Sequence, residues 1–237
     1  MIKDSKDLCI IGGAKGLIGQ NLLHNFAAKG YRAIGLDMKC ANSHNSFELD
    51  LTDESHVKEV MEKIFRQDLY ETVTLINTQG IADPYHDPIE DLSLKKWQEY
   101  FNTNVTSYFL LAKEMVKHQK SYTKGSIINL SSTRSFMAEK NTEAYCMTKG
   151  AITSFTKALA MSCDKGKIRV NSISPGWIAE TEHDFSEDQV NQHPVNLIGE
   201  PEDIFHLCYF LSLPASKFIT GQDFIVDGGM TSKMIYK

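Results

Sequence analysis

The sequence has little of what several protein classes require. Its five cysteines are odd in number and scattered, without a CxxC pair, so neither a disulfide framework nor a thiolate metal site is indicated. No apolar run is long enough to span a membrane, and the charged start MIKDSKD lacks the apolar core of a signal peptide. The 25 basic residues, against 30 acidic ones, form no concentrated face of the kind that nucleic acid needs. We therefore expect a cytoplasmic protein without membrane or nucleic-acid partners.

The length of 237 residues suffices for one sizeable core, and no repeat, low-complexity tract or linker divides the chain. We therefore expect one domain over residues 1–237. Apolar runs typical of buried strands occupy residues 8–11, 32–36, 47–51, 73–77, 126–130, 169–174 and 224–226. Seven strands alternating with about six helices predict an α/β fold, a doubly wound parallel sheet covered on both faces.

A glycine-rich turn follows the first of these runs. Gly12, Gly13, Gly16 and Gly19 come directly after it, and apolar residues then recur at helical spacing. Such a turn brings a helix N-terminus and bare backbone amides close to a diphosphate. Glycines also simply end many strands, but this position between a strand and a helix favours dinucleotide binding.

The second and third strands each end near a carboxylate. Asp37 would accept hydrogen bonds from both adenosine ribose hydroxyls and repel a 2′-phosphate, which favours NAD over NADP. Lys15 and Lys39 point to the alternative, because either could reach a 2′-phosphate. Asp50 is either a turn or helix-dipole residue, or a contact of the adenine edge.

The stretch from Gly125 to Gly150 holds the clearest chemistry. Ser132 stands where a strand ends, Tyr145 follows it, and Lys149 comes four residues after the tyrosine. Positions i and i+4 share a helix face, so Lys149 is expected beneath the Tyr145 ring. A neighbouring ammonium lowers the pKa of a phenol from its usual value of about 10. Tyr145 would then exchange a proton with an alcohol or carbonyl oxygen that Ser132 also hydrogen-bonds.

Two further features have open interpretations. Asn104 lies inside a predicted helix over about 94–117, where its amide is either bonded locally or holds a water. The segment at about 177–197 is acidic and lacks clear periodicity, and we expect it to be a loop that covers a site. His183 and His193 fit no metal-ligand spacing, so no metal is expected.

Taken in order, these pieces resemble the short-chain dehydrogenase/reductase superfamily, in its compact single-domain branch with a Rossmann fold, over essentially the full length. A Tyr with Lys four residues later occurs about once by chance in such a chain, so the weight lies in the whole set. The matching positions are Gly13 to Gly19, Asp37, Asp50, Asn77, Gly80, Asn104, Ser132, Tyr145, Lys149, Pro175, Gly176 and the ending TGQDFIVDGG.

The resemblance implies an NAD-dependent oxidoreductase that interconverts a secondary alcohol and a ketone, assembled as a homo-tetramer or homo-dimer. Tyr145 would be the acid/base and Ser132 the carbonyl partner. Lys149 would lower the tyrosine pKa and hold the nicotinamide ribose, and Asn104 would keep a water in a proton relay. The implied cofactor contacts are Gly13, Lys15, Gly16, Leu17, Ile18, Gly19, Asp37, Asp50, Leu51, Asn77, Gly80, Tyr145, Lys149, Pro175, Gly176 and Ile178.

The chain also departs from the family pattern. Gly12 stands where the family has a threonine, and Gln79 replaces the alanine of Asn-Asn-Ala-Gly, which puts a polar group near the nicotinamide. The family threonine that meets the carboxamide falls at Glu180, and Thr181 is the candidate to replace it.

Substrate identity is the least determined part. Arg134 occupies a place where the family usually has a small residue. It would either clamp a substrate carboxylate or phosphate, or pair with Glu139, Glu143 or the acidic segment. Gln79 and Trp177 are further candidates for the pocket wall. Alternatives to a dehydrogenase are a non-catalytic dinucleotide sensor or scaffold, and an epimerase or dehydratase that retains its NAD.

Overall fold

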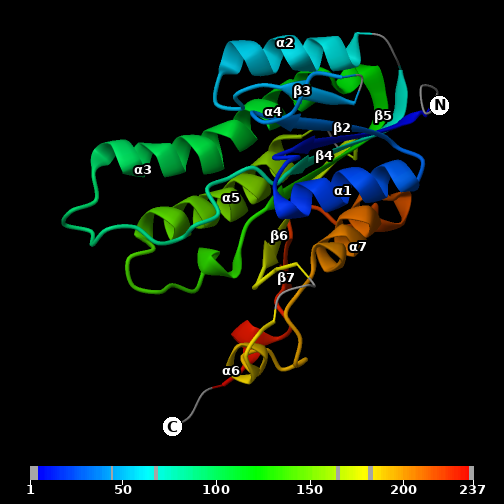
Figure 1. The fold of residues 1–237 in the computed structure, drawn as a ribbon. Coiled ribbons are helices and arrows are strands. Elements are labelled where there is room, and N and C mark those ends of the chain that lie inside the picture. The colour runs from blue at the N-terminus through cyan, green and yellow to red at the C-terminus, as the bar shows by residue number, and fades with distance from the viewer. Residues whose placement is uncertain (1–4, 44, 67–68, 164–165, 181–183, 235–237) are drawn as a thin grey trace.

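The computed structural model describes residues 5–43, 45–66, 69–163, 166–180 and 184–234. Within them, seven parallel strands form one sheet in the order β3-β2-β1-β4-β5-β6-β7 (Figure 1). The strands are β1 (Asp7–Gly12), β2 (Arg32–Asp37), β3 (Ser46–Glu48), β4 (Tyr70–Asn77), β5 (Tyr122–Leu130), β6 (Ile168–Pro175) and β7 (Asp223–Val226). The predicted doubly wound α/β fold is confirmed.

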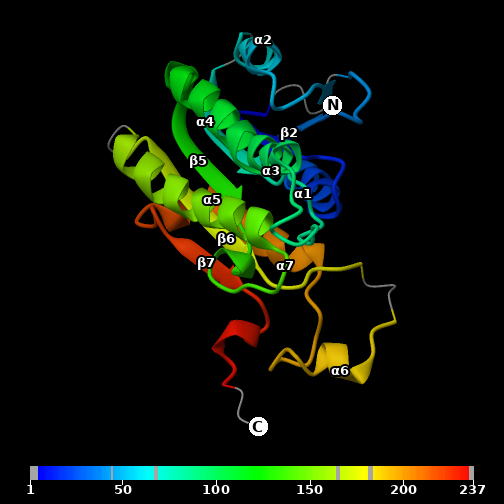
Figure 2. The same cartoon turned by 90° about the vertical axis from the view of Figure 1, so that its left-hand side faces the viewer.

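Helices cover both faces of the sheet (Figures 1 and 2). One face carries α2 (Glu54–Phe65), α4 (Ser107–Lys117) and α5 (Glu143–Ser162), and the other carries α1 (Leu17–Ala28) and α7 (Pro201–Ser212). Alternate residues of β1 serve the two cores: Leu8 and Ile10 pack in the first, Cys9 and Ile11 in the second. Because both faces are buried, the strand sequences are continuous apolar runs.

Two predicted elements differ from the structure. The third strand, expected over 47–51, ends at Glu48, because β3 is an edge strand that pairs with β2 only as far as Asp37. The helix expected over 94–117 is α3 (Leu94–Phe101) and α4 joined by a π-helical turn, Asn102–Thr106. The helix ends expected near residues 68 and 165 lie outside the described residues.

The strand register places the candidate site. Gly12 is level with Asn77, and Asn77 is level with Asn129. The loops that follow β1, β4 and β5 therefore leave the sheet at the same edge. The helices that follow β1 and β4 cover opposite faces of the sheet. This change of side opens a crevice between the two strands at their carboxyl ends, where such folds bind their ligands.

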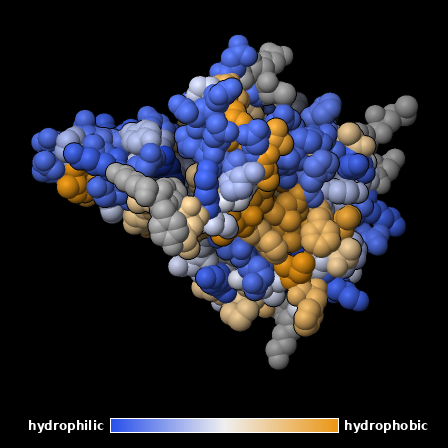
Figure 3. Space-filling model, turned by 90° about the horizontal axis from the view of Figure 1, so that it is seen from below, coloured by the Kyte–Doolittle hydropathy of each residue, from blue (hydrophilic) through white to orange (hydrophobic). Residues whose placement is uncertain are grey.

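The chain between β6 and α7 projects from this edge and carries α6 (Glu187–Val190) beside the C-terminal segment (Figures 1 and 2). Its base is closed by two backbone hydrogen bonds, from Gly199 N to the Trp177 carbonyl (3.1 Å) and from Ala179 N to the Gly199 carbonyl (2.9 Å). Seen from this end, apolar surface gathers in the middle of the molecule (Figure 3). Within the described residues, no helix has both the length and the apolar character needed to cross a bilayer.

Candidate active site

A cavity of about 300 Å³ opens at the carboxyl ends of β1, β2 and β4. Its lining includes Gly13, Gly16, Asp37, Asp50, Leu51, Gln79 and Gly80, all named by sequence reasoning, and Met38, Thr52, Thr78, Thr103 and Ser107, which were not. Thr78 has a clear structural role, because its hydroxyl donates to the carbonyls of Gly12 (2.7 Å) and Gly13 (3.2 Å). It thereby ties the glycine turn to the end of β4.

The glycine turn allows the close backbone approach that a diphosphate needs, although the amides of Gly13, Ala14, Lys15 and Gly16 are already bonded within the protein. Gly13 has a φ of 76°, and a Cβ there would lie 2.5 Å from the backbone nitrogen of Gln79. A Cβ on Gly19 would collide with the Gly13 carbonyl. No side chain caps α1 at Gly16, and no acidic residue stands in its first turn, so the positive end of this helix is uncompensated. The bare glycine backbone and the positive end of α1 fit the dinucleotide that the sequence predicts.

Asp37 stands on the wall of this cavity and is fixed by two backbone amides. Its Oδ2 accepts from the amide of Lys15 and its Oδ1 from the amide of Lys39, both at 3.0 Å. Asp50 lines the same cavity, but its Oδ1 accepts from the amide and hydroxyl of Thr52, each at 2.8 Å. Of the alternatives for Asp50, the turn role is present, and its cavity position leaves an adenine contact open.

Other expected cofactor residues lie outside the lining of the cavity. Asn77 is fully buried, and its amide donates to the Oδ1 of Asn129 at 2.8 Å, linking β4 to β5. Pro175 and Gly176 end β6 beside the C-terminal segment, where Gly176 N donates to the Val226 carbonyl at 2.9 Å. The lining also excludes Lys15 in the glycine turn, Leu17, Ile18 and Gly19 at the start of α1, Tyr145 and Lys149 on α5, and Ile178, which forms a bridge with Gly199.

Ser132, Tyr145 and Lys149 converge next to this edge of the sheet. Ser132 is the second residue after β5, while the tyrosine and lysine lie on the first turns of α5. The Lys149 ammonium lies 5.5 Å from the centroid of the Tyr145 ring and donates to the Leu130 carbonyl at 3.1 Å. The predicted position of Lys149 beneath the tyrosine ring is therefore observed.

The expected lowering of the Tyr145 pKa is absent from the unliganded protein. Burial raises the pKa of Tyr145 above its usual value, and this effect exceeds the lowering by the hydrogen-bonding Ser132 hydroxyl and by the charge of Arg134. Burial also lowers the pKa of Lys149 to about 8. The sequence argument counted the attraction between the two groups and left out the cost of removing both from water.

Asn104 lies in the π-helical turn, a distortion common at functional sites, and is fully buried. Its Oδ1 accepts from the amide of Ile81 at 2.7 Å, and its Nδ2 donates to the hydroxyl of Thr148 at 3.1 Å. A Cβ on Gly80 would lie 3.0 Å from the Asn104 Oδ1, so that glycine gives the asparagine its space. The side chain is thus bonded to the protein and joins the cavity wall to α5. The sequence analysis did not predict Thr148 as a site residue, because its contact with Asn104 depends on how α5 packs against the π-helical turn.

The three expected substrate residues lie apart. Gln79 is on the cofactor side, buried against the glycine turn, where its Nε2 donates to the Ser107 hydroxyl at 3.1 Å. Trp177 lies at the base of the projecting segment, its ring 5.4 Å from that of Phe185. Arg134 follows Ser132 closely and pairs with Glu139, as one of its alternatives proposed.

The described part of the projecting segment contacts the C-terminal residues. Val195 N donates to the Gly228 carbonyl at 3.2 Å, and Lys233 donates to the Asn191 carbonyl at 2.7 Å, so the segment packs on the C-terminal residues. Thr181 and His183 lie outside the described residues. Among the residues that are described, no cluster of three or more His, Cys, Asp or Glu side chains could hold a metal.

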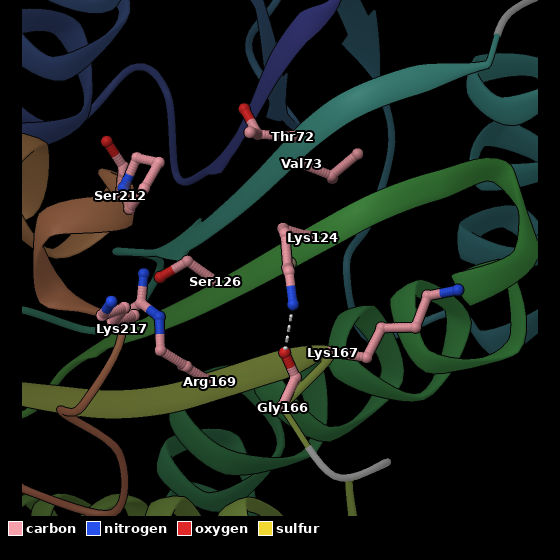
Figure 4. A pocket seen from close by; sticks show the side chains of 11 residues that line it. Thr72, Val73, Lys124, Ser126, Gly166, Lys167, Arg169, Ser212 and Lys217 are labelled. Carbon is pink, nitrogen blue, oxygen red and sulfur yellow. Dashed lines mark hydrogen bonds between the residues drawn. The ribbon is translucent and has the colours of Figure 1, made fainter.

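A second cavity, of about 190 Å³, lies at the amino ends of β4, β5 and β6, on the side of the sheet away from the candidate site (Figure 4). Four basic residues line it: Lys124, Lys167, Arg169 and Lys217. Their charges serve the fold in part, because Arg169 donates to the Leu211 carbonyl at 2.6 Å near the end of α7, and Lys124 donates to the Gly166 carbonyl at 3.0 Å.

Comparisons with known proteins agree on the kind of protein. Residues 21–231 match a family model described as enoyl-(acyl carrier protein) reductase. The chain is 32% identical to an uncharacterized oxidoreductase of Thermotoga maritima, with 99% of each chain covered. It resembles the structure of ElxO with NADP bound (27% identity, 97% and 100% covered, TM-score 0.83). It also resembles 4-hydroxyisoleucine dehydrogenase complexed with NADH (28% identity, 96% and 100% covered, TM-score 0.83).

Proposed function

The chain belongs to the short-chain dehydrogenase/reductase superfamily and is an oxidoreductase that interconverts an alcohol and a ketone with a nicotinamide cofactor; from this premise we propose that NAD(H) is preferred and that Asn104, Ser132, Tyr145 and Lys149 carry the proton transfer. The bound cofactor supplies or accepts the hydride. The observation that carries the proposal is the convergence of Ser132 and Lys149 on the partly buried Tyr145 side chain, beside the cavity that fits a dinucleotide.

Tyr145 acts as the acid when a ketone is reduced. Its raised pKa keeps the phenol protonated at neutral pH, ready to donate to the carbonyl oxygen, while the Ser132 hydroxyl donates to the same oxygen. The negative charge that then develops on the phenol is stabilised by the Lys149 ammonium. Because Lys149 is buried, this attraction is less screened than it would be at the surface. In the oxidation direction the same groups return the proton.

Asp37 supports the preference for NAD. Its carboxylate is held in place by the amides of Lys15 and Lys39, so a cofactor 2′-phosphate would meet a fixed negative charge. The two lysines use their backbones in this contact and leave their side chains free. Those side chains are the alternative route to NADP, and relatives with either cofactor are known.

Fluorescence titration of the purified protein with NADH and with NADPH tests the cofactor preference. We expect tight NADH binding, weak NADPH binding, and a loss of NADH affinity in Asp37→Ala, but not in the exposed control Glu62→Ala on α2. Tighter NADPH binding would contradict the preference for NAD and make Lys15 and Lys39 the residues to substitute. Binding without turnover of any ketone would favour the non-catalytic sensor.

We further propose a cytoplasmic homo-oligomer, a dimer or tetramer, built on the helices that bear Asn104 and Tyr145. Exposed apolar side chains on α3 and α4, namely Leu94, Phe101 and Phe109, support a buried partner surface there. Light scattering of the wild type and of Phe109→Glu tests this. A monomeric wild type would contradict it.

We also propose that the projecting segment at about 177–197 closes over the site when ligands bind. Its base at Trp177, Ile178 and Gly199 is a short bridge about which the rest could turn. Limited proteolysis should cut the segment in the free protein, and NADH with a substrate should protect it. Equal cleavage in both states would contradict the closure.

A further inference from the structure

The guanidinium of Arg134 lies at the reacting end of the site. Arg134 is the second residue after Ser132, within the 3₁₀ turn Thr133–Ser135, and its amide donates to the Ser132 hydroxyl at 3.1 Å. Its positive charge also acts on the Tyr145 phenol and lowers the pKa of that group in part. Arg134 is therefore close to both groups that would hold the substrate oxygen.

Two neighbours hold this guanidinium by one of its ends. Its Nη2 donates to the Glu139 carboxylate and to the Tyr85 hydroxyl (3.4 Å), and its carbon lies 5.3 Å from the centroid of the Tyr85 ring. The Tyr85 hydroxyl donates in turn to the same Glu139 oxygen at 2.9 Å. These contacts fix the plane of the guanidinium without using all its donors.

Among the residues that the structure describes, none accepts a hydrogen bond from the other end of the guanidinium. Nη1 is buried from solvent and makes no hydrogen bond. Arginine presents its donors in a rigid planar fork that matches a carboxylate, and a buried donor without an acceptor is costly. An acceptor is therefore missing at Nη1 of a residue whose backbone amide bonds Ser132 and whose charge acts on Tyr145.

We propose that Nη1 of Arg134 binds a carboxylate carried by the substrate, so that the substrate pair is a hydroxy acid and its oxo acid. This inference rests on the proposed function of the site. Glu139 already neutralises part of the arginine charge, so a singly charged carboxylate fits better than a doubly charged phosphate beside it. Tyr85 and Glu139 act as positioning residues, because they orient the guanidinium and leave Nη1 to the ligand.

The described acids of the projecting segment form no ion pair with Arg134. Among the described residues, the acid that pairs with Arg134 is Glu139, from the loop before α5. The short helix α6, with Glu187 and Asp188, lies instead beside the C-terminal segment, away from α5 (Figures 1 and 2). Within the part of the segment that the structure describes, no carboxylate is paired with Arg134.

The test compares secondary hydroxy acids, with the hydroxyl two to four carbons from the carboxylate, with their neutral methyl esters. The wild type should prefer the acid. Arg134→Gln should lower kcat/KM for the acid about 10- to 100-fold, mainly through KM, and change it less than about 3-fold for the ester. Lys140→Gln, which removes the same charge from an exposed position in the same loop, should change neither, and NADH affinity should be unaffected throughout.

The substitution Glu139→Gln provides an independent test, because it keeps Arg134 and removes the carboxylate that competes with the substrate for the guanidinium. We expect this variant to lower KM for the acid about 2- to 5-fold while leaving KM for the ester unchanged. Equal losses for acid and ester in Arg134→Gln, a wild type indifferent to the carboxylate, or a preference for the phosphate monoester of a diol would each overturn the assignment.

Failure of the proposed catalytic function would be distinguishable from failure of the carboxylate assignment. If the wild type turned over no alcohol or ketone, the inference would be decided by equilibrium binding of succinate to the protein–NADH complex, followed by fluorescence. Binding that is lost in Arg134→Gln and kept in Lys140→Gln would support a carboxylate site without catalysis. Equal binding by the wild type and Arg134→Gln, or no binding by the wild type, would overturn the inference.

Discussion

The side-chain oxygen of Gln79 occupies the space that a side chain on residue 12 would need: a Cβ on Gly12 would lie 2.5 Å from Gln79 Oε1. These are two of the positions at which the chain departs from its family pattern, and the structure shows that they depend on each other. The missing threonine side chain at residue 12 makes room for the larger residue at 79. Gln79 is thereby buried beneath the glycine turn, where it bonds Ser107.

This coupling predicts a compensating pair of substitutions. Gly12→Ala should lower the free energy of unfolding by about 1–2 kcal/mol, because the new methyl group overlaps the Gln79 amide and the Leu111 side chain. In the Gln79→Ala background the same change should cost less, with a coupling of about 1 kcal/mol in a double-mutant cycle measured by urea denaturation. Strictly additive costs would show that the two sites are independent.

Tyr145→Phe should remove catalysis and leave cofactor binding intact. The variant keeps the ring above Lys149 but has no proton to exchange, so kcat should fall by about 10²–10⁴-fold. NADH affinity, measured by fluorescence, should stay within about twofold of the wild type, since the ring remains in place. Substantial residual activity would mean that another group transfers the proton.

The buried Lys149 should destabilise the folded protein at pH values below the pKa that this lysine has in the folded state. Its pKa is lowered to about 8 from an ordinary value of 10.5, so the unfolded chain binds more protons between these values and stability rises with pH across that window. Lys149→Met should therefore raise the free energy of unfolding at pH 7 by up to about 3 kcal/mol, and this gain should shrink from pH 8 to 10.5. The Leu130 carbonyl keeps the Tyr108 hydroxyl as a donor at 3.0 Å, so the variant leaves no buried acceptor unpaired.

The pH dependence distinguishes this explanation from simple repacking. Urea denaturation of wild type and Lys149→Met at pH 7, 9 and 10.5 gives the difference directly. A difference that stays constant with pH would assign the stability change to packing, and a variant less stable at pH 7 would contradict the desolvation argument.

Asn104→Ala should detach the cavity wall from α5. The substitution leaves the Ile81 amide without its acceptor and Thr148 without its donor, and should cost about 2–4 kcal/mol of stability. Hydrogen exchange at the Ile81 amide should become fast in this variant. In the control Thr148→Val the Ile81 amide should stay protected, because its bond to Asn104 survives. Rapid exchange in both variants would show that the loop depends on the whole network.

Much of the fold and of the site could be predicted because it is local in sequence. Strands buried on both faces must be continuous apolar runs, and β1, β4 and β5 fall where such runs were found. The glycine turn, Asp37 at the end of β2, and Ser132 with Tyr145 and Lys149 are each defined by residues a few positions apart. The end of the edge strand β3 was wrong and the π turn at Asn104 was missed, because strand pairing and helix packing determine them.

The sequence by itself determined which chemical groups the protein has and the order of the elements that carry them. Only the tertiary structure decided which groups meet: Asn104 with Ile81 and Thr148, Gln79 with Gly12, and Arg134 with Glu139. It also decided the protonation of the site, since burial outweighs the attraction between Tyr145 and Lys149. The physical reason is that hydrogen bonds, close contacts and desolvation depend on distance in space, and the sheet register brings together residues that are far apart in the chain.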